Sequence, residues 1–252
     1  MMKDRLIQVM SPLAALLIWE ICARTGILDV RFFPAPSAIF YHLLFVSPEE
    51  GIIQDVLASL NRLLWGYLAG CLLGIIFGVG MGLCRSLRAA IYPIIALTYP
   101  IPKIAILPLV MLIFGIGDLA KIVIVAIGSF FLVLINTLHG VDSIDRIYHD
   151  VAAVYKIKRR NFILKIILPG SLPAIFTGLK LAIGYSLVMV VAAEFSGADK
   201  GIGYLIWQSW ETFSIKSMYA GIFVIGLLGF IFSYALHALE RRLIPWRPQQ
   251  QK

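Results

Sequence analysis

Long apolar runs alternate with short polar segments along almost the whole chain. Six runs are close to the length of about 20 residues that a helix needs to cross the hydrocarbon core of a membrane. They cover residues 6–23, 63–83, 91–114, 119–140, 172–194 and 218–239. A backbone inside lipid must satisfy its own hydrogen bonds, and these runs are too long for the strands of a membrane barrel. The pattern therefore predicts an all-α, polytopic membrane bundle with about six transmembrane helices.

Glycine and proline mark two of these runs. In the second run a glycine recurs at every fourth position, at Gly66, Gly70, Gly74, Gly78 and Gly82. This spacing leaves one helix face without side chains and predicts close packing against another helix, rather than a ligand-binding loop. The third run is interrupted by prolines, which remove backbone donors and predict a kink or a local unwinding. These prolines are Pro100, Pro102 and Pro108.

The composition supports the membrane interpretation. Hydrophobic residues make up 60% of the chain, charged residues 14%, and the mean hydropathy is +0.89, which exceeds what a soluble domain needs for its core. The net charge of +8 would suggest nucleic acid as a partner in a soluble protein. Here the basic residues lie in short segments beside apolar runs, so we expect contact with membrane lipid and no nucleic acid.

The distribution of Lys and Arg predicts an orientation. Fourteen of these residues fall on one side of the predicted spans, the side that holds both termini and residues 150–169. Six fall on the other side, at Arg24, Arg31, Arg62, Lys121, Lys200 and Lys216. Because basic loops stay in the cytoplasm, we expect a multi-pass protein of the bacterial cytoplasmic (inner) membrane with both termini inside. Trp19 and Glu20 stand where a signal peptide would need small residues, so the first run is expected to be retained.

Four polar residues near the apolar runs are candidates for a translocation path. Lys103 could line a path and attract an anion, or it could snorkel or pair with a buried acid such as Glu20. Ser129 and Asn136 could form interhelical hydrogen bonds or line the path. Glu194 precedes a glycine-rich segment that we interpret as a re-entrant or interfacial turn, and it could instead close the outer end of the path.

The sequence offers no chemistry for an enzyme. The three cysteines are odd in number and lack metal-ligand spacing, so we expect neither a disulfide framework nor a metal site. A Gly-x-x-x-x-Gly-Lys-Ser/Thr loop is missing from the sequence, so this chain is not expected to bind ATP itself. We expect no catalytic residue and no cofactor on this chain.

The segment from Val141 to Leu168 is the most polar interruption between the runs. Its apolar residues recur at spacings of three and four, which is typical of an amphipathic helix. They include Ile144, Ile147, Val151, Val154 and Tyr155. Such a face must be buried, and the residues alone leave two candidates open, the membrane interface and a groove in another protein.

Several segments resemble a known family. Asp150-Val151-Ala152, with Lys156 and the later Leu168-Pro169, resembles the EAA motif of binding-protein-dependent ABC importer permeases, which marks their coupling helix. Other segments resemble the nitrate, sulfonate and taurine branch of this family, in the order 59–62, 114–118, 136–141, 177–184 and 201–206. Asp150, Val151 and Lys156 stand where the motif has Glu, Ala and Gly. Lys156 therefore predicts either a continuous helix or a turn formed by a residue other than glycine.

The resemblance implies an architecture and a set of partners. Residues 1–252 would form a single transmembrane permease domain of the type I ABC importer kind, with a cytoplasmic coupling segment at about 141–169. A second permease copy, most simply an identical one, would complete the pathway. A pair of ATP-binding subunits would bind ATP and Mg and hydrolyse the ATP. A solute-binding protein, periplasmic or lipid-anchored, would deliver the solute.

The resemblance also assigns roles within the coupling segment. Val154 and Tyr155 would form the face that docks on the ATPase, Lys156 could meet an acidic residue there, and Pro169 would turn the chain back toward the membrane. The coupling residues are expected at Asp150, Ala152, Val154, Tyr155, Lys156, Lys158, Arg159, Arg160, Leu168 and Pro169.

The implied solute is a small anion such as nitrate, bicarbonate, a sulfonate or taurine. An alternative within the same importer class is a vitamin-like heterocycle, such as riboflavin or a thiamine precursor. An alternative from another class is an ion-coupled secondary transporter that uses Glu20, Lys103 and Glu194 as a relay.

Overall fold

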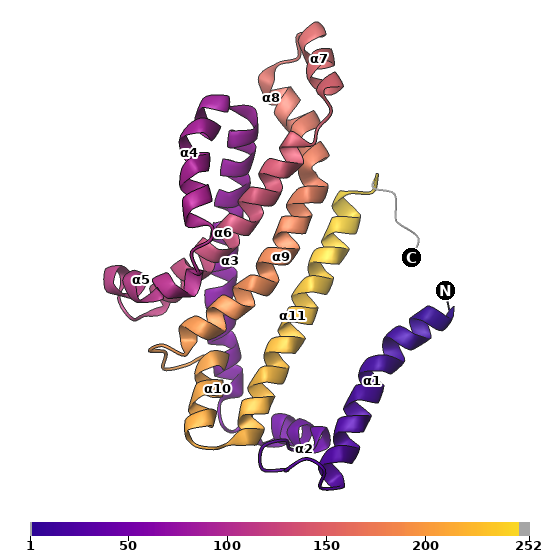
Figure 1. Cartoon of the computed structure of the whole chain (residues 1–252), viewed down its shortest axis with the longest axis vertical. Helices are drawn as coiled ribbons and strands as arrows, with labels where there is room; N and C mark the ends of the chain where they lie inside the picture. The colour runs from indigo at the N-terminus through magenta and orange to yellow at the C-terminus, as the bar shows by residue number, and fades with distance from the viewer. Residues whose placement is uncertain (1, 247–252) are drawn as a thin grey trace. The chain divides into compact units, whose positions relative to one another are not determined.

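The computed structural model describes residues 2–246, with side chains from Met10 onward, and Arg247 and Lys252 of the predicted basic side lie outside this part. Within it every regular element is helical (Figure 1). The elements in chain order are α1 (Met2–Arg24), α2 (Pro36–Tyr41), η1 (His42–Val46), α3 (Ile52–Leu83), α4 (Arg85–Thr98), η2 (Lys103–Ile106), α5 (Leu107–Phe114), α6 (Asp118–Asp142), α7 (Arg146–Val154), α8 (Arg159–Phe162), η3 (Ile163–Ile167), α9 (Leu168–Glu194), α10 (Ile202–Glu211) and α11 (Ile215–Leu243).

Among the described residues, four helical segments are long and apolar enough to cross a membrane: α3, α6, the stretch Arg159–Glu194, and α11. A fifth candidate is the pair formed by α4 and Lys103–Phe114, which is bent by 92° at the break. This bend confirms the kink predicted from the prolines. The structure thus supports four or five of the six predicted spans. The first predicted span corresponds to α1, which is not among them and whose side chains are described only in part.

The chain divides into two compact units. The smaller unit contains the described residues up to Ser59 together with Asp199–Leu227. The larger unit contains Leu60–Ala198 and the described residues from Leu228 onward. Helices α3 and α11 each contribute residues to both units.

Helices α6 and α9 form the centre of the larger unit. They run antiparallel, because Gly140 near the end of α6 faces Ser171 near the start of α9, whereas Gly128 faces Tyr185 further along. Their contact buries side chains such as Val133 and Val190 completely. The later part of α11 contacts α9 through an ion pair between Lys180 and Glu240.

Helix α3 lies along α6 in the same direction, with the glycine stripe at the contact. We use this name for Gly66, Gly70, Gly74, Gly78 and Gly82. A side chain at any of them would begin 2.2–2.9 Å from an atom of α6. The facing residues also advance four at a time, and the pairs are Gly66 with Val125, Gly70 with Ser129, Gly74 with Val133, Gly78 with Thr137 and Gly82 with Val141. The predicted close helix packing is confirmed.

The smaller unit is held by aromatic contacts among α1, α2 and α11. The rings of Trp19 and Tyr219 lie 5.6 Å apart between centroids, and those of Phe40 and Phe223 lie 4.6 Å apart. Ser37 does not cap the short helix here, because α2 already begins at Pro36. Ser37 instead donates hydrogen bonds to the Glu20 carboxylate from both its backbone nitrogen and its hydroxyl.

Candidate functional site

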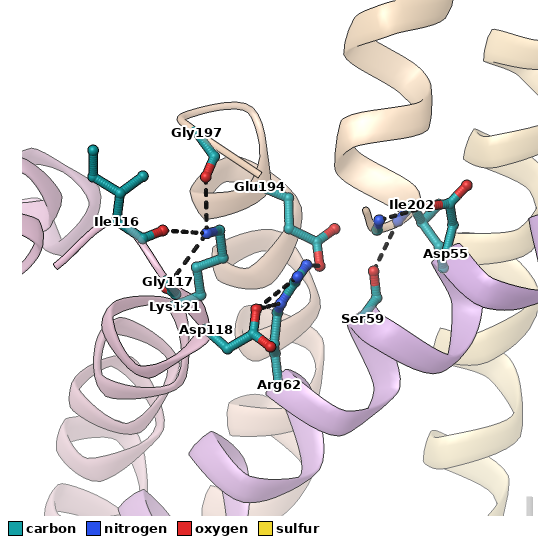
Figure 2. Close-up of polar contacts among 11 residues, drawn as sticks. Asp55, Ser59, Arg62, Ile116, Gly117, Asp118, Lys121, Glu194, Gly197 and Ile202 are labelled. Atoms are coloured by element: carbon teal, nitrogen blue, oxygen red, sulfur yellow. Dashed lines mark hydrogen bonds and ion pairs between the residues drawn. The ribbon is translucent and has the colours of Figure 1, made fainter. Parts of the chain in front are cut away.

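A largely buried ionic cluster in the larger unit joins α3 to the start of α6 and the end of α9 (Figure 2). Arg62 lies on α3 four residues before Gly66, so it occupies the next position of the row that the glycine stripe forms. Its guanidinium lies 2.7 Å from Oε1 of Glu194, at the end of α9, and 2.7 Å from Oδ1 of Asp118, at the start of α6. The side chains of Arg62 and Glu194 are 6% and 0% exposed, and that of Asp118 is 58% exposed.

Lys121 extends this cluster by one turn of α6. Its ammonium donates hydrogen bonds to the carbonyls of Ile116 at 2.8 Å and Gly197 at 3.1 Å, and more weakly to that of Gly117 (Figure 2). These carbonyls belong to the turn before α6 and the turn after α9. Lys121 therefore ties two irregular segments together. We call Arg62, Asp118, Lys121 and Glu194 the Arg62 cluster.

The sequence identified only one member of the Arg62 cluster, Glu194. Arg62 and Lys121 were expected in external loops, and this expectation is wrong because both side chains are buried within helices. The signal for Arg62 was present in the four-residue row that continues into the glycine stripe. The signal for Asp118 was its place in the 114–118 segment, directly before an apolar run.

A second polar contact lies within the smaller unit. Oδ1 of Asp55 and Oγ of Ser59 accept hydrogen bonds at 2.8 Å from the backbone nitrogens of Gly201 and Ile202 (Figure 2). These two N–H groups belong to the first turn of α10, where they have no partner within the helix. Two residues one turn apart on α3 thus hold the beginning of α10. This contact brings together the 59–62 and 201–206 segments, two of those that resemble the importer family in sequence.

Lys103 has partners other than those predicted. Its ammonium donates to the carbonyls of Thr98 at 2.7 Å and Ile101 at 3.0 Å, and it lies 4.1 Å from the centre of the Phe131 ring. A cation is favourable there because the carbonyls at the end of a helix lack partners within it. Pairing with Glu20 is wrong, since that carboxylate binds Ser37 and Arg24. A path-lining role for Lys103 stays a prediction.

Ser129 and Asn136 bond to their own helix. Ser129 Oγ donates to the carbonyl of Val125 at 2.8 Å, and Asn136 Nδ2 donates to that of Leu132 at 2.8 Å. The expectation of interhelical hydrogen bonds is therefore wrong for both. Ser129 contributes to helix contact in another way, because it is the small residue that faces Gly70.

The predicted coupling segment contains an exposed amphipathic helix, α7, at the connection between α6 and α9 (Figure 1). The helix begins after Asp145, whose carboxylate accepts a hydrogen bond from the Ile147 nitrogen. Ala152 is buried. Val154 and Tyr155 are 78% and 76% exposed, so the face predicted to dock is open. Asp150 is also exposed.

Lys156 ends this helix in the left-handed conformation, with φ at +49°. The Lys156 nitrogen donates to the carbonyl of Ala153 at 3.1 Å, and the Ile157 nitrogen donates to that of Ala152 at 2.9 Å. This pair of hydrogen bonds is the Schellman motif, which usually has glycine at this position. Of the two geometries left open by the sequence, the structure has the turn. The backbone of the motif is retained although its glycine is absent.

The chain continues from this turn into α9 without interruption. Lys158, Arg159 and Arg160 are exposed at the start of α8, and α8, η3 and α9 follow one another directly. The predicted turn at Pro169 is therefore wrong. Pro169 lies in the first turn of α9 just after η3, a π-helical stretch. The wider π-helical turn gives space for the proline ring and tolerates the absence of a backbone N–H donor at Pro169. Leu168 and Pro169 are half-buried.

Residues 70–245 match the family model of the binding-protein-dependent transport system inner membrane component. The chain is 34% identical to the taurine transport system permease protein TauC of Escherichia coli, over 96% of this chain and 90% of that one. It is also 34% identical to the nitrate import permease protein NrtB of Leptolyngbya laminosa, over 78% of this chain and 71% of that one. An inward-facing structure of the MetNI methionine ABC transporter matches in fold with a TM-score of 0.69 at 16% identity, over 79% of this chain and 99% of that one.

Proposed function

Because the chain belongs to the family of binding-protein-dependent transport system inner membrane components, we propose that it forms the membrane path for a small anion in an ATP-driven importer. It is a permease subunit of an ABC importer, and its family is one of transport proteins rather than enzymes. The solute-binding protein and the ATPase on which such a system depends are separate partners. ATP and Mg would bind to that ATPase.

The proposed solute is a small molecule with a compact oxyanion group. Support comes from the names of the relatives, which specify taurine and nitrate transport. Lys103 adds no support, because its ammonium is occupied by backbone carbonyls. A vitamin-like heterocycle in the same class of importer remains the alternative solute. An ion-coupled transporter that works without an ATPase would be the alternative mechanism.

Transport by the assembled system tests this proposal. The chain would be reconstituted in vesicles with its partner ATPase and solute-binding protein, and uptake of labelled taurine, nitrate and riboflavin would be compared with and without ATP. We expect ATP-dependent uptake of one anion. Uptake of riboflavin alone would replace the solute class, and uptake driven by an ion gradient with the ATPase omitted would overturn the mechanism.

We also propose that α7 docks on the ATPase, so that closure of an ATPase pair moves α7 and, through α6 and α9, the pathway. Helix α7 is joined by short connections to α6 and to α8, which continues through η3 into α9, and its end exposes two large apolar side chains to the surroundings. Exposed apolar groups beside charged ones are typical of a protein-binding surface. Two identical permease copies with cytoplasmic termini would place a coupling helix opposite each ATPase.

Polar substitution of the exposed end of α7 tests this coupling. The double variant Val154→Ser, Tyr155→Ser should still insert in the membrane, because both side chains are exposed. It should lose most ATP-dependent uptake and most of its co-purification with the ATPase. Ile27→Ser, another exposed apolar position, serves as the control and should keep both. Full uptake and full co-purification of the double variant would reject α7 as the docking helix.

A further inference from the structure

An apolar groove of about 520 Å³ lies in the larger unit, beside the end of α3. Its walls are formed by Val79 and Leu83 of α3, Leu87 of α4 and Ile163 of η3. Arg159, the first residue of α8, is the single charged residue in the lining. Cys84, which also lines the groove, connects α3 to α4. We call this the Arg159 groove. Its surface is almost entirely apolar, so contact with water there is unfavourable.

The charge at this groove has no counterpart in the part of the chain that the structure describes. Arg159 is exposed and forms no ion pair with any of those residues, and the same holds for its neighbours Lys158 and Arg160. A guanidinium binds phosphate well, since its donors match two phosphate oxygens. The groove thus combines an apolar body with an unpaired cation, which is complementary to an amphiphile with a negative head.

The position of the groove along α3 indicates where that amphiphile comes from. The groove is lined by the last turns of a membrane-spanning helix, and Arg85 and Arg88 follow directly in the sequence. Basic residues of this kind mark the level of the lipid headgroups. We therefore expect the apolar part of the groove at the depth of the acyl chains and Arg159 at the headgroup end.

We propose that the Arg159 groove binds one anionic phospholipid of the surrounding bilayer, with an acyl chain along α3 and η3 and its phosphate on the Arg159 guanidinium. Basic pockets between membrane helices are known to favour anionic headgroups. Arg159 follows the Lys156 turn by only three residues. A bound headgroup would thus lie beside the segment that connects α7 to α9. The proposal concerns membrane lipid and does not depend on the transported solute.

Cys84 provides a natural probe of occupancy, because it lines the groove and is a free thiol. The full chain would be placed in nanodiscs of pure phosphatidylcholine, or of phosphatidylcholine with added phosphatidylglycerol. Alkylation by N-ethylmaleimide would be followed on the Cys84 peptide by mass spectrometry. We expect phosphatidylglycerol to slow alkylation about fivefold, the preference that one basic residue gives for an anionic headgroup.

Three variants assign the effect to Arg159. Arg159→Gln should remove the difference between the two kinds of nanodisc, Arg159→Lys should keep most of it, and the neighbouring Arg160→Gln, outside the lining, should keep all of it. Equal rates in the two lipids for the unaltered chain would overturn the proposal, and so would a difference that survives Arg159→Gln. Protection that follows protein concentration instead of lipid would assign the groove to a second copy of the chain. If Arg159→Gln fails to fold, the alkylation rates of the unaltered chain and of Arg159→Lys in the two kinds of nanodisc still test the proposal.

Discussion

Arg62 is the residue whose environment departs most from what its type suggests. A buried charge is tolerated only when opposite charges and hydrogen bonds compensate for the loss of water. Glu194 supplies such a charge from a fully buried position, and Asp118 supplies a second one from an exposed position. The two ion pairs should therefore contribute very differently, although their distances are equal.

Removal of the Arg62 charge should destabilise the protein strongly. Arg62→Met leaves the Glu194 carboxylate buried without this cation, and we expect a loss of about 3–5 kcal/mol. Asp118→Asn should cost at most about 1 kcal/mol, because the Asp118 side chain is largely solvated. Thermal unfolding of the purified protein would measure both effects.

The double variant Arg62→Met, Glu194→Met provides the control for this prediction. It removes both buried charges and should recover most of the stability that Arg62→Met loses. An equally unstable double variant would show that shape, rather than the loss of the Arg62 charge beside the Glu194 carboxylate, causes the instability.

Lys156 carries a smaller conformational cost. A residue with a side chain in the left-handed region is less stable there by about 1–2 kcal/mol than glycine, which has no Cβ. Lys156→Gly should therefore raise the free energy of unfolding by about 0.5–1 kcal/mol, after the extra entropy of glycine in the unfolded chain is subtracted. Thermal unfolding of the variant would measure this gain.

Lys156→Ala separates conformation from charge. It removes the ammonium and keeps the strained backbone, so it should not be stabilised. If both variants bind the ATPase less well, the ammonium contributes to docking. If Lys156→Gly is less stable than the original chain, the assignment of strain to this turn is wrong.

At the scale of the elements, the contact between α3 and α6 depends on the absence of side chains. A Cβ at Gly70 would lie 2.2 Å from the Ala126 carbonyl oxygen and from Ser129 Oγ. A backbone oxygen cannot move away without displacing its helix. The two helices would have to separate, and contacts along several turns would weaken.

Gly70→Ala should lower stability by about 1–3 kcal/mol, the usual range for overpacking of a tight interior. Gly184→Ala is the matched control, because Gly184 lies inside α9 with open space around its Cβ position. There alanine should raise stability by up to about 1 kcal/mol through its better helix propensity. Thermal unfolding midpoints of the two variants should move in opposite directions, and a shared direction would contradict the packing argument.

The sequence predicted those elements that are specified by their own residues. The glycine stripe, the bend at the prolines of the third run and an amphipathic helix within residues 141–168 follow from local spacing. The helix that continues through Pro169 could not be predicted in this way, because it depends on a π-helical turn that no residue pattern predicts.

At the scale of the whole molecule, the class of fold could be predicted and most of the Arg62 cluster could not. Apolar runs identify membrane helices without any knowledge of their neighbours. A charge at the end of a run is ambiguous, because the same residue can face water or another helix. Arg62 and Lys121 belong to the second kind, and only the arrangement of α3, α6 and α9 reveals it.

The orientation across the membrane is a further prediction at this scale. A cysteine at Lys158 should react with a membrane-impermeant thiol reagent only after the cells are opened, whereas a cysteine at Asp199 should react in intact cells. The reason is the excess of Lys and Arg on the side of residues 150–169. Both positions are exposed, so the difference reports the side of the membrane. Reaction of both in intact cells would contradict the orientation.

The matched four-residue steps of α3 and α6 have a consequence for how the chain selects one alignment. Because both contact rows repeat every four residues, a slip of α3 along α6 by four residues, about 6 Å, would bring glycines against small or branched residues again. The glycine stripe alone therefore specifies closeness but not register. Arg62 breaks the repeat, since a slipped helix would take its charge away from Glu194 and Asp118. We therefore expect the Arg62 cluster to set the register of α3 against α6.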